Sequence, residues 1–211
     1  MNAEQSAKIA DAKRVANPGC YPQGPIILLG PLMRAGLISP DMQISVNAIS
    51  GYSGGGRQMI EAYEAMGETT PSFMPYALDF NHKHLPEMKR HTGLNNDPLF
   101  QPAVGNYAQG MLTMVPLNFA GIAGAPKGAE LHETIGAHLA EIENSFVELM
   151  DMEPGQKLAD LNPEALNDTN KMQLYVFSND DRQQVLLVAV YDNLGKGASG
   201  AAVQNLDLML G

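Results

Sequence analysis

A single cysteine, Cys20, stands on a segment rich in glycine and proline. Pro18 and Gly19 precede it, and an apolar run from Gly24 to Ala35 that suits a helix follows it. A thiol placed before a helix lies near the positive end of the helix dipole, which lowers its pKa. Cysteines of a protein core sit instead inside periodic apolar runs. The sequence therefore predicts that Cys20 is an exposed, reactive thiol with a lowered pKa.

Two histidines, His82 and His84, are separated by one residue and would point the same way from an extended strand. An imidazole can remove or return the proton of a cysteine nucleophile, so we expect the pair on the same side of the sheet as Cys20. With Glu87 or His91 the pair could instead form a mixed imidazole and carboxylate metal site. Two solvated surface histidines are the third alternative, and spacing alone does not choose among these three.

Two glycine-rich segments could approach an anionic ligand through the backbone. Residues 51–56 join a predicted strand to a predicted helix, a layout that often presents N–H groups to anions. Residues 195–200 fit G-x-G-x-x-G and follow a predicted strand, which is the local context of a dinucleotide-binding fingerprint. Residues 201–211 are too few to supply the second strand of a βαβ unit. We therefore expect no Rossmann domain within these residues.

These candidate residues must be positioned by strands and helices that alternate without strict order. Strands are predicted over residues 43–50, 107–119, 173–178 and 184–191, the last two as a hairpin. Helices are predicted over residues 24–35, 57–65 and 131–149 and after residue 195, and residues 66–100 are predicted to be irregular. The expected class is α+β, with a mainly antiparallel or mixed sheet covered by helices.

Composition excludes several classes of protein. The chain has 211 residues, and 23 acidic against 13 basic residues give a formal net charge of −10, which argues against nucleic-acid partners. No apolar stretch approaches the roughly 20 residues that cross a bilayer. One cysteine cannot form an internal disulfide, so nothing indicates an oxidising compartment. We expect a cytoplasmic protein without nucleic-acid or membrane partners.

Four runs of the sequence carry a family resemblance. They are VANPGCYP at 15–22, VNAISGYSGGGR at 46–57, HKHLPEM at 82–88 and YDNLGKGASGAAVQN at 191–205. In this order they resemble the signature blocks of N-acetyl-γ-glutamyl-phosphate reductase in its shorter bacterial subtype, although Gln23 stands where the family usually has Thr. The resemblance implies a fold like the C-terminal domain of glyceraldehyde-3-phosphate dehydrogenase. It also implies that residues 1–211 form one catalytic and dimerisation domain of a homo-oligomer.

The resemblance further implies an activity in arginine biosynthesis, the NADPH-dependent reductive dephosphorylation of N-acetyl-γ-glutamyl phosphate to N-acetylglutamate semialdehyde. Cys20 would attack the acyl phosphate and form a thioester, which hydride from NADPH would reduce. One histidine of the pair would be the acid/base group, and we expect His82, with Glu87 orienting it. His84 remains the alternative.

Contacts with the ligands follow from the same resemblance. The residues expected at NADP(H) are Ser53, Gly54, Asn193, Lys196 and Gly197, those expected at the substrate are Asn17 and Arg57, and no metal is required. The Rossmann half that would hold most of the NADP(H) is expected to be absent from this chain, so the isolated chain should be inactive. A metal-dependent enzyme that uses the His82 and His84 pair, and an inactive interaction module, are the alternatives from other classes.

Overall fold

The computed structural model describes residues 3–142, 145–152 and 161–211. Its centre is a seven-stranded sheet with the strand order β2-β3-β1-β4-β7-β6-β5. The strands are β1 (Ser45–Gly51), β2 (Phe73–Pro75), β3 (Leu99–Gly105), β4 (Met111–Asn118), β5 (Val147–Leu149), β6 (Met172–Asn179) and β7 (Gln184–Tyr191). Strand β1 pairs with β3, and β5 with β6, in parallel, whereas the other neighbours are antiparallel. The predicted mixed sheet of an α+β fold is confirmed.

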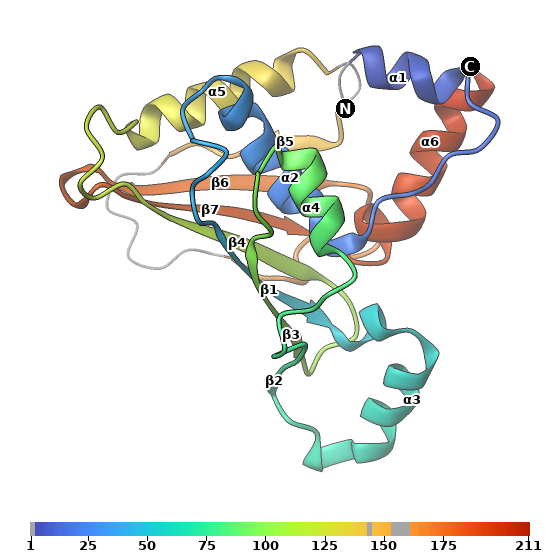
Figure 1. The fold of residues 1–211 in the computed structure, drawn as a ribbon. Coiled ribbons are helices and arrows are strands. Elements are labelled where there is room, and N and C mark those ends of the chain that lie inside the picture. The colour runs from blue at the N-terminus through green and yellow to red at the C-terminus, as the bar shows by residue number, and fades with distance from the viewer. Residues whose placement is uncertain (1–2, 143–144, 153–160) are drawn as a thin grey trace.

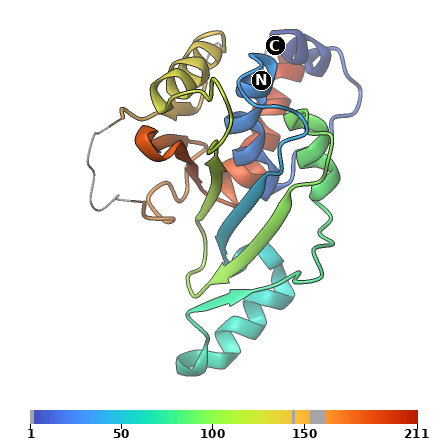
Figure 2. The same cartoon turned by 60° about the vertical axis from the view of Figure 1, so that its left-hand side comes forward.

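Six described helices surround this sheet, and three of them cover one of its faces (Figures 1 and 2). The helices are α1 (Ala3–Ala10), α2 (Cys20–Arg34), α3 (Arg57–Met66), α4 (Leu85–Thr92), α5 (Gly128–Ala140) and α6 (Gly200–Leu210). Helices α2, α4 and α5 lie on the covered face, α1 packs against α6 at one end, and α3 stands beyond the strands at the other end. Leu28 and Leu32 of α2 are fully buried together with Leu131 of α5 and Leu187 of β7, so the core lies between these helices and the sheet.

Helix α2 begins earlier than the sequence predicts, at Cys20 rather than at Gly24. Pro22 lies in its first turn, where backbone N–H groups have no helical acceptor, so a proline is tolerated there. Gly24 lets the helix lie directly on β4, because a Cβ at this position would be 1.9 Å from Oγ1 of Thr113. Cys20 is therefore the first residue of a helix that is pressed against the sheet.

The region 66–100 was predicted to be irregular, and this prediction is wrong, since it contains β2, α4 and the start of β3. His82 and His84 lie in the loop that leads into α4 rather than on a strand, and His84 caps that helix with φ −89° and ψ −7°. The apolar signal of α4 is weak because its buried side chains, Leu85, Met88 and Thr92, are few and widely spaced. The two histidines therefore lie on a turn, with their ring centroids 4.8 Å apart.

The long helix predicted over 131–149 is also wrong at its C-terminal end. Helix α5 ends at Ala140, and Val147–Leu149 forms β5 beside β6. Residues 143–144 of the predicted helix lie outside the described residues. Leu149 still faces α5, because a Cβ on Gly136 would be 3.5 Å from its Cδ2. The apolar residues of β5 therefore continue the three- and four-residue spacing of α5 along the sequence, although they belong to a strand that packs against that helix.

Two further local predictions concern the strands β4, β6 and β7. Strands β6 and β7 form the predicted antiparallel hairpin, joined by a short 3-10 turn at Asp180–Arg182. The predicted strand over 107–119 begins only at Met111, because Gly110 turns the chain with φ +105°. Among the described residues, no helix is long and apolar enough to cross a membrane.

Candidate active site

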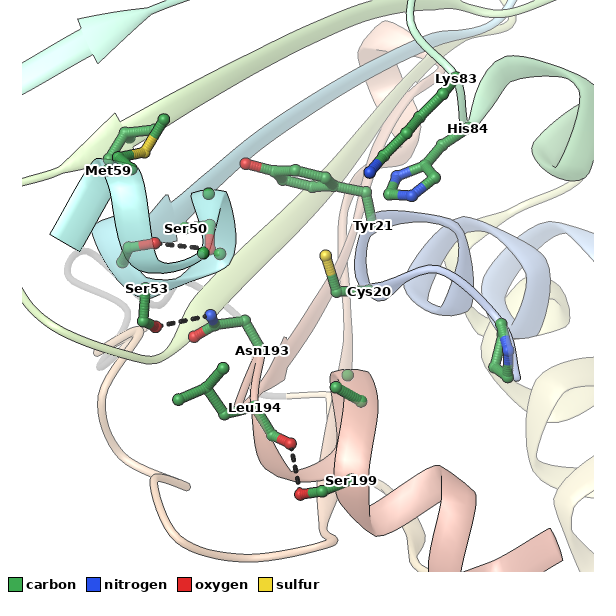
Figure 3. A pocket seen from close by; sticks show the side chains of 18 of the residues that line it. Cys20, Tyr21, Ser50, Ser53, Met59, Lys83, His84, Asn193, Leu194 and Ser199 are labelled. Atoms are coloured by element: carbon green, nitrogen blue, oxygen red, sulfur yellow. Dashed lines mark hydrogen bonds between the residues drawn. The ribbon is translucent and has the colours of Figure 1, made fainter. Parts of the chain in front are cut away.

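Segments that are distant in sequence meet around a cavity of about 620 Å³ (Figure 3). Its walls come from the start of α2, the loop before α4, the 3-10 turn Tyr52–Gly55 after β1, and the π-helical turn Gly195–Ser199 before α6. Predicted site residues that line it are Asn17, Cys20, Ser53, Gly54, His82, His84, Asn193 and Gly197. The volume suits a small ligand together with part of a larger one.

The Cys20 side chain points into this cavity from the first position of α2 (Figure 3). Burial raises the pKa of the half-buried thiol, although the backbone N–H groups of Tyr21 and Cys20 and the charge of Lys83 act in the opposite direction. The predicted lowering of the pKa is therefore wrong, because loss of water outweighs the helix terminus. The group that faces the cavity at neutral pH is a thiol.

Both histidines line the cavity with Cys20, which confirms that they lie on its side of the sheet. The His84 ring rests on Gly19, where a Cβ would be 2.5 Å from Nε2. The His82 ring packs among aromatic rings instead, with its centroid 5.0 Å from that of Phe100 and 5.9 Å from that of Tyr21. Geometry thus separates the pair, with His84 against the residue that precedes the cysteine and His82 in an aromatic setting.

The two imidazoles are uncharged at neutral pH. Burial is the main cause that lowers the pKa of His84 to about 4. Electrostatic repulsion from His82 and from the Lys83 ammonium adds to this effect. Burial and Lys83 also lower the pKa of His82. Nδ1 of His82 accepts from the backbone N–H of His84 at 3.2 Å, so the proton of the His82 ring lies on Nε2. A neutral imidazole beside a thiol can accept the proton that the sulfur must lose before it attacks carbon.

Two side chains hold the backbone of Cys20 in place. Both carboxylate oxygens of Glu87 accept from the backbone N–H of Gly19, at 3.1 and 3.2 Å. Glu87 thus binds the turn before the nucleophile, rather than orienting a histidine as expected. The Tyr191 hydroxyl donates to the Cys20 carbonyl at 2.8 Å and accepts from the Gly24 N–H at 3.3 Å, so it bridges the first turn of α2. Sequence reasoning missed Tyr191, which carries no local signal of this role.

Asn193 and the neighbouring aspartate fix the opposite wall. The Asn193 amide is 2% exposed, donates to Oγ of Ser53 at 3.0 Å and accepts from the Gly110 N–H at 2.7 Å. Asp192, which the sequence analysis also missed, accepts from the backbone N–H groups of Asp168 and Leu194 at 2.8 and 2.9 Å. Asn193 therefore positions the glycine loop, because both ends of its amide are already bonded.

Glycine backbone leaves room around the thiol. A Cβ on Gly197 would be 3.0 Å from the Cβ of Cys20, and one on Gly54 would be 3.0 Å from Oγ of Ser50. The missing side chains at Gly54 and Gly197 thus leave space beside Ser50 and Cys20 that a flat ring could occupy.

Comparison with known proteins identifies the family to which this chain belongs. Residues 20–193 match the family described as semialdehyde dehydrogenase, dimerisation domain. The whole chain aligns with N-acetyl-γ-glutamyl-phosphate reductases from Chelativorans sp. (strain BNC1), at 60% identity, and Mesorhizobium japonicum, at 57% identity, and covers 68% of each. The chain belongs to the N-acetyl-γ-glutamyl-phosphate reductase family. Relatives of this family are thus longer than the sequence described here.

Solved structures support the fold of this reductase family member. Aspartate semialdehyde dehydrogenase II from Vibrio cholerae matches with a TM-score of 0.64 at 17% identity, over 98% of this chain and 65% of that one. A probable aspartate-semialdehyde dehydrogenase from Pseudomonas aeruginosa matches with a TM-score of 0.67 at 16% identity, over 100% of this chain and 67% of that one. At this identity the similarity establishes the fold alone.

Two residues that the reductase resemblance assigned to ligands lie away from the Cys20 cavity. Arg57 is at the start of α3, its side chain is 89% exposed, and its Nε donates to Glu61 at 2.6 Å. Lys196 lines a second cavity of about 750 Å³, where its Nζ donates to Gln204 at 2.8 Å and burial lowers its pKa to about 8. Asn17 lines both cavities and accepts from the amide of Asn205 at 2.8 Å.

The metal alternative gains no support from the geometry. Across residues 3–142, 145–152 and 161–211, no group of three or more His, Cys, Asp or Glu side chains is placed to hold a metal ion. His82 and His84 lie with their ring centroids 4.8 Å apart, and Glu87 is occupied by the Gly19 N–H.

Proposed function

We propose that this chain performs the thiol chemistry of an NADPH-dependent reductive dephosphorylation of N-acetyl-γ-glutamyl phosphate to the semialdehyde, with Cys20 as the nucleophile. The observation that carries the proposal is the Cys20 thiol and the neutral His84 imidazole on one cavity, in a chain 60% identical to a protein named for this activity. Asn17, on the rim of the same cavity, is the proposed contact for the acyl chain of the substrate.

In the first step His84 accepts the thiol proton while the sulfur attacks the acyl carbon. The bond from that carbon to the phosphate oxygen breaks, inorganic phosphate leaves and a thioester remains on Cys20. NADPH, when bound, supplies the hydride that reduces the acyl group to the level of an aldehyde. As the aldehyde leaves, its bond to sulfur breaks and His84 returns the proton to the Cys20 thiolate. Glu87 and Tyr191 keep the sulfur in position by holding the backbone on either side of it.

For the cofactor we propose a divided site. Ser53, Gly54 and Gly197 offer the backbone surface for the nicotinamide, and Asn193 holds the loop that carries two of them. Lys196 lines the other cavity and Arg57 is paired with Glu61, so neither contributes to this nicotinamide surface. We propose that the nucleotide is held chiefly outside residues 1–211, which act as the catalytic and dimerisation domain. Calorimetric titration of the 211-residue chain with NADPH should then show weak binding or none, and tight binding would contradict this division.

We also propose that a second copy of the chain packs on the open face of the sheet. In both fold views, α2, α4 and α5 occupy one face, and no described helix covers the opposite face of β6 and β7. That face carries the half-buried apolar side chains of Leu112, Met114, Tyr175, Phe177 and Leu186. An apolar patch of this kind, in a family described as a dimerisation domain, indicates a homo-oligomer.

The test of the chemistry uses an acyl phosphate and the chain as it stands. Intact-mass measurement should show one acyl group on Cys20, and a colorimetric assay should show one equivalent of phosphate released. Cys20→Ala should abolish both signals, and His84→Asn should slow them about 100-fold, as expected for loss of a general base. His82→Asn is the matched control and should have the smaller effect. Phosphate release that survives Cys20→Ala would refute the covalent route, and an inert wild-type chain would favour an interaction module.

A further inference from the structure

The proposed substrate brings negative charge to a site whose reacting groups are uncharged. In an acyl phosphate the phosphoryl group is bonded directly to the carbonyl that the sulfur attacks. A cation near that position would stabilise the bound substrate and the charge that develops on the leaving phosphate. Among the described residues, Lys83 is the one Lys or Arg that lines the Cys20 cavity.

Lys83 is placed to act on the reacting atoms. It lies between the two histidines, and its side chain runs beside the His84 ring into the space above the Cys20 thiol (Figure 3). Its charge lowers the pKa of Cys20, of His82 and of His84, so its electrostatic field reaches all three groups.

The backbone around Lys83 is fixed on both sides. The His84 N–H donates to Nδ1 of His82 at 3.2 Å, and the Leu85 N–H donates to the His82 carbonyl at 3.0 Å. The His84 carbonyl accepts from the Met88 N–H at 3.0 Å in the first turn of α4. The loop therefore fixes the backbone of Lys83 beside the cavity, while the exposed Lys83 side chain remains accessible to a ligand.

We propose that Lys83 binds the phosphoryl group of the acyl phosphate, whereas the sequence had indicated Arg57 as the cation that contacts the substrate. The inference rests on the proposed function, which supplies the substrate class. When the carbon–oxygen bond breaks, its electron pair stays on the phosphate oxygen. The Lys83 ammonium stabilises that charge without giving up a proton, the departing phosphate takes up a proton from water, and the thiol proton stays on His84.

Alkylation of Cys20 tests this assignment without any reductase activity. Iodoacetate carries a carboxylate next to the reacting carbon, so its negative charge approaches the sulfur closely, as the phosphoryl charge of an acyl phosphate does, whereas iodoacetamide is neutral and of similar size. The ratio of the two rates therefore cancels changes in the amount of thiolate and reports the local potential. At low salt, Lys83→Met should lower the ratio of iodoacetate to iodoacetamide rates about ten-fold, as expected for a unit charge removed at close range.

Matched variants sharpen the result. Lys83→Arg should retain the ratio, and Arg90→Met should also retain it, because Arg90 is an exposed cation on α4 that does not line the cavity. In the wild-type chain the ratio should fall as salt is added, a measurement that needs no variant. A ratio that is insensitive both to salt and to Lys83→Met would overturn the proposal.

A second comparison separates the phosphoryl group from other anions. Acetyl phosphate carries a phosphoryl group but no other acid, and p-nitrophenyl acetate transfers the same acetyl group without charge. Lys83→Met should slow acylation of Cys20 by acetyl phosphate about ten-fold and leave the neutral ester nearly unaffected. Equal slowing of both reagents would overturn the assignment to the phosphoryl group. If acetyl phosphate fails to acylate the wild-type chain while the alkylation ratio still depends on Lys83, the proposed function fails and the anion site stands.

Discussion

At the scale of single residues, burial decides when Cys20 can react. Loss of water raises the pKa of its thiol despite its place at a helix N-terminus. Iodoacetamide labelling of the folded chain should therefore have a pH midpoint above that of free cysteine. The sequence contains one cysteine, so the labelling rate reports a single group. The unfolded chain is the control and should return to the ordinary midpoint, whereas a folded-state midpoint below that of free cysteine would restore the sequence-based prediction.

His84 links the same site to the stability of the fold. Its pKa falls from an ordinary 6.5 to about 4 on folding, so the unfolded chain binds more protons between these values. Stability that is present above pH 6.5 is therefore lost as the pH falls toward 4. Because water still reaches half of the ring, we expect about 1 kcal/mol from this residue. Denaturant unfolding at pH 7 and pH 5 should show a smaller pH effect in His84→Asn than in the wild type, and equal effects would contradict the assignment.

At the scale of elements, we predict opposite effects on stability for alanine substitutions at two glycines of α2. Gly24→Ala should destabilise the fold by about 1–3 kcal/mol, because the new methyl group would meet the buried Thr113 hydroxyl at 1.9 Å. Gly30→Ala should leave stability unchanged or raise it by up to about 1 kcal/mol. Its methyl group would meet only the flexible end of Arg34 at 3.2 Å and the His91 carbonyl at 3.7 Å.

Denaturant unfolding of both variants gives the comparison. Since the two glycines share one helix, their difference removes the general effect of alanine on helix formation. Similar free energies of unfolding for Gly24→Ala and Gly30→Ala would show that α2 does not press on β4 at Thr113. A large loss of stability in Gly24→Ala alone would also explain how the helix holds Cys20 at a fixed depth in the cavity.

At the scale of the whole molecule, the open sheet face should control assembly. Phe177→Glu places a charge among the apolar side chains that would face a second copy, and it should shift the chain from dimer to monomer in sedimentation velocity. Leu210→Glu is the control, because Leu210 is a 77% exposed apolar residue on α6 and away from that face. Dissociation by Leu210→Glu with no effect of Phe177→Glu would place the interface elsewhere.

The sequence by itself determined the elements and residues that depend on neighbours along the chain. Strand β1, helix α3 and the β6–β7 hairpin follow from apolar spacing and turn residues within a few positions. The cysteine block and the glycine loop are likewise local, and they carried the family resemblance that the comparisons confirm.

Tertiary structure decided what each of these residues touches. Glu87 and Gly19 are 68 positions apart, and Tyr191 and Cys20 are 171 apart, so no local spacing indicates that they are bonded. The raised pKa of Cys20, the contact of His84 with Gly19 and the place of Lys196 in another cavity also depend on packing between elements. Desolvation and hydrogen bonding act through space, whereas sequence patterns describe order along the chain, and for this reason the chemistry of the thiol emerged only with the fold.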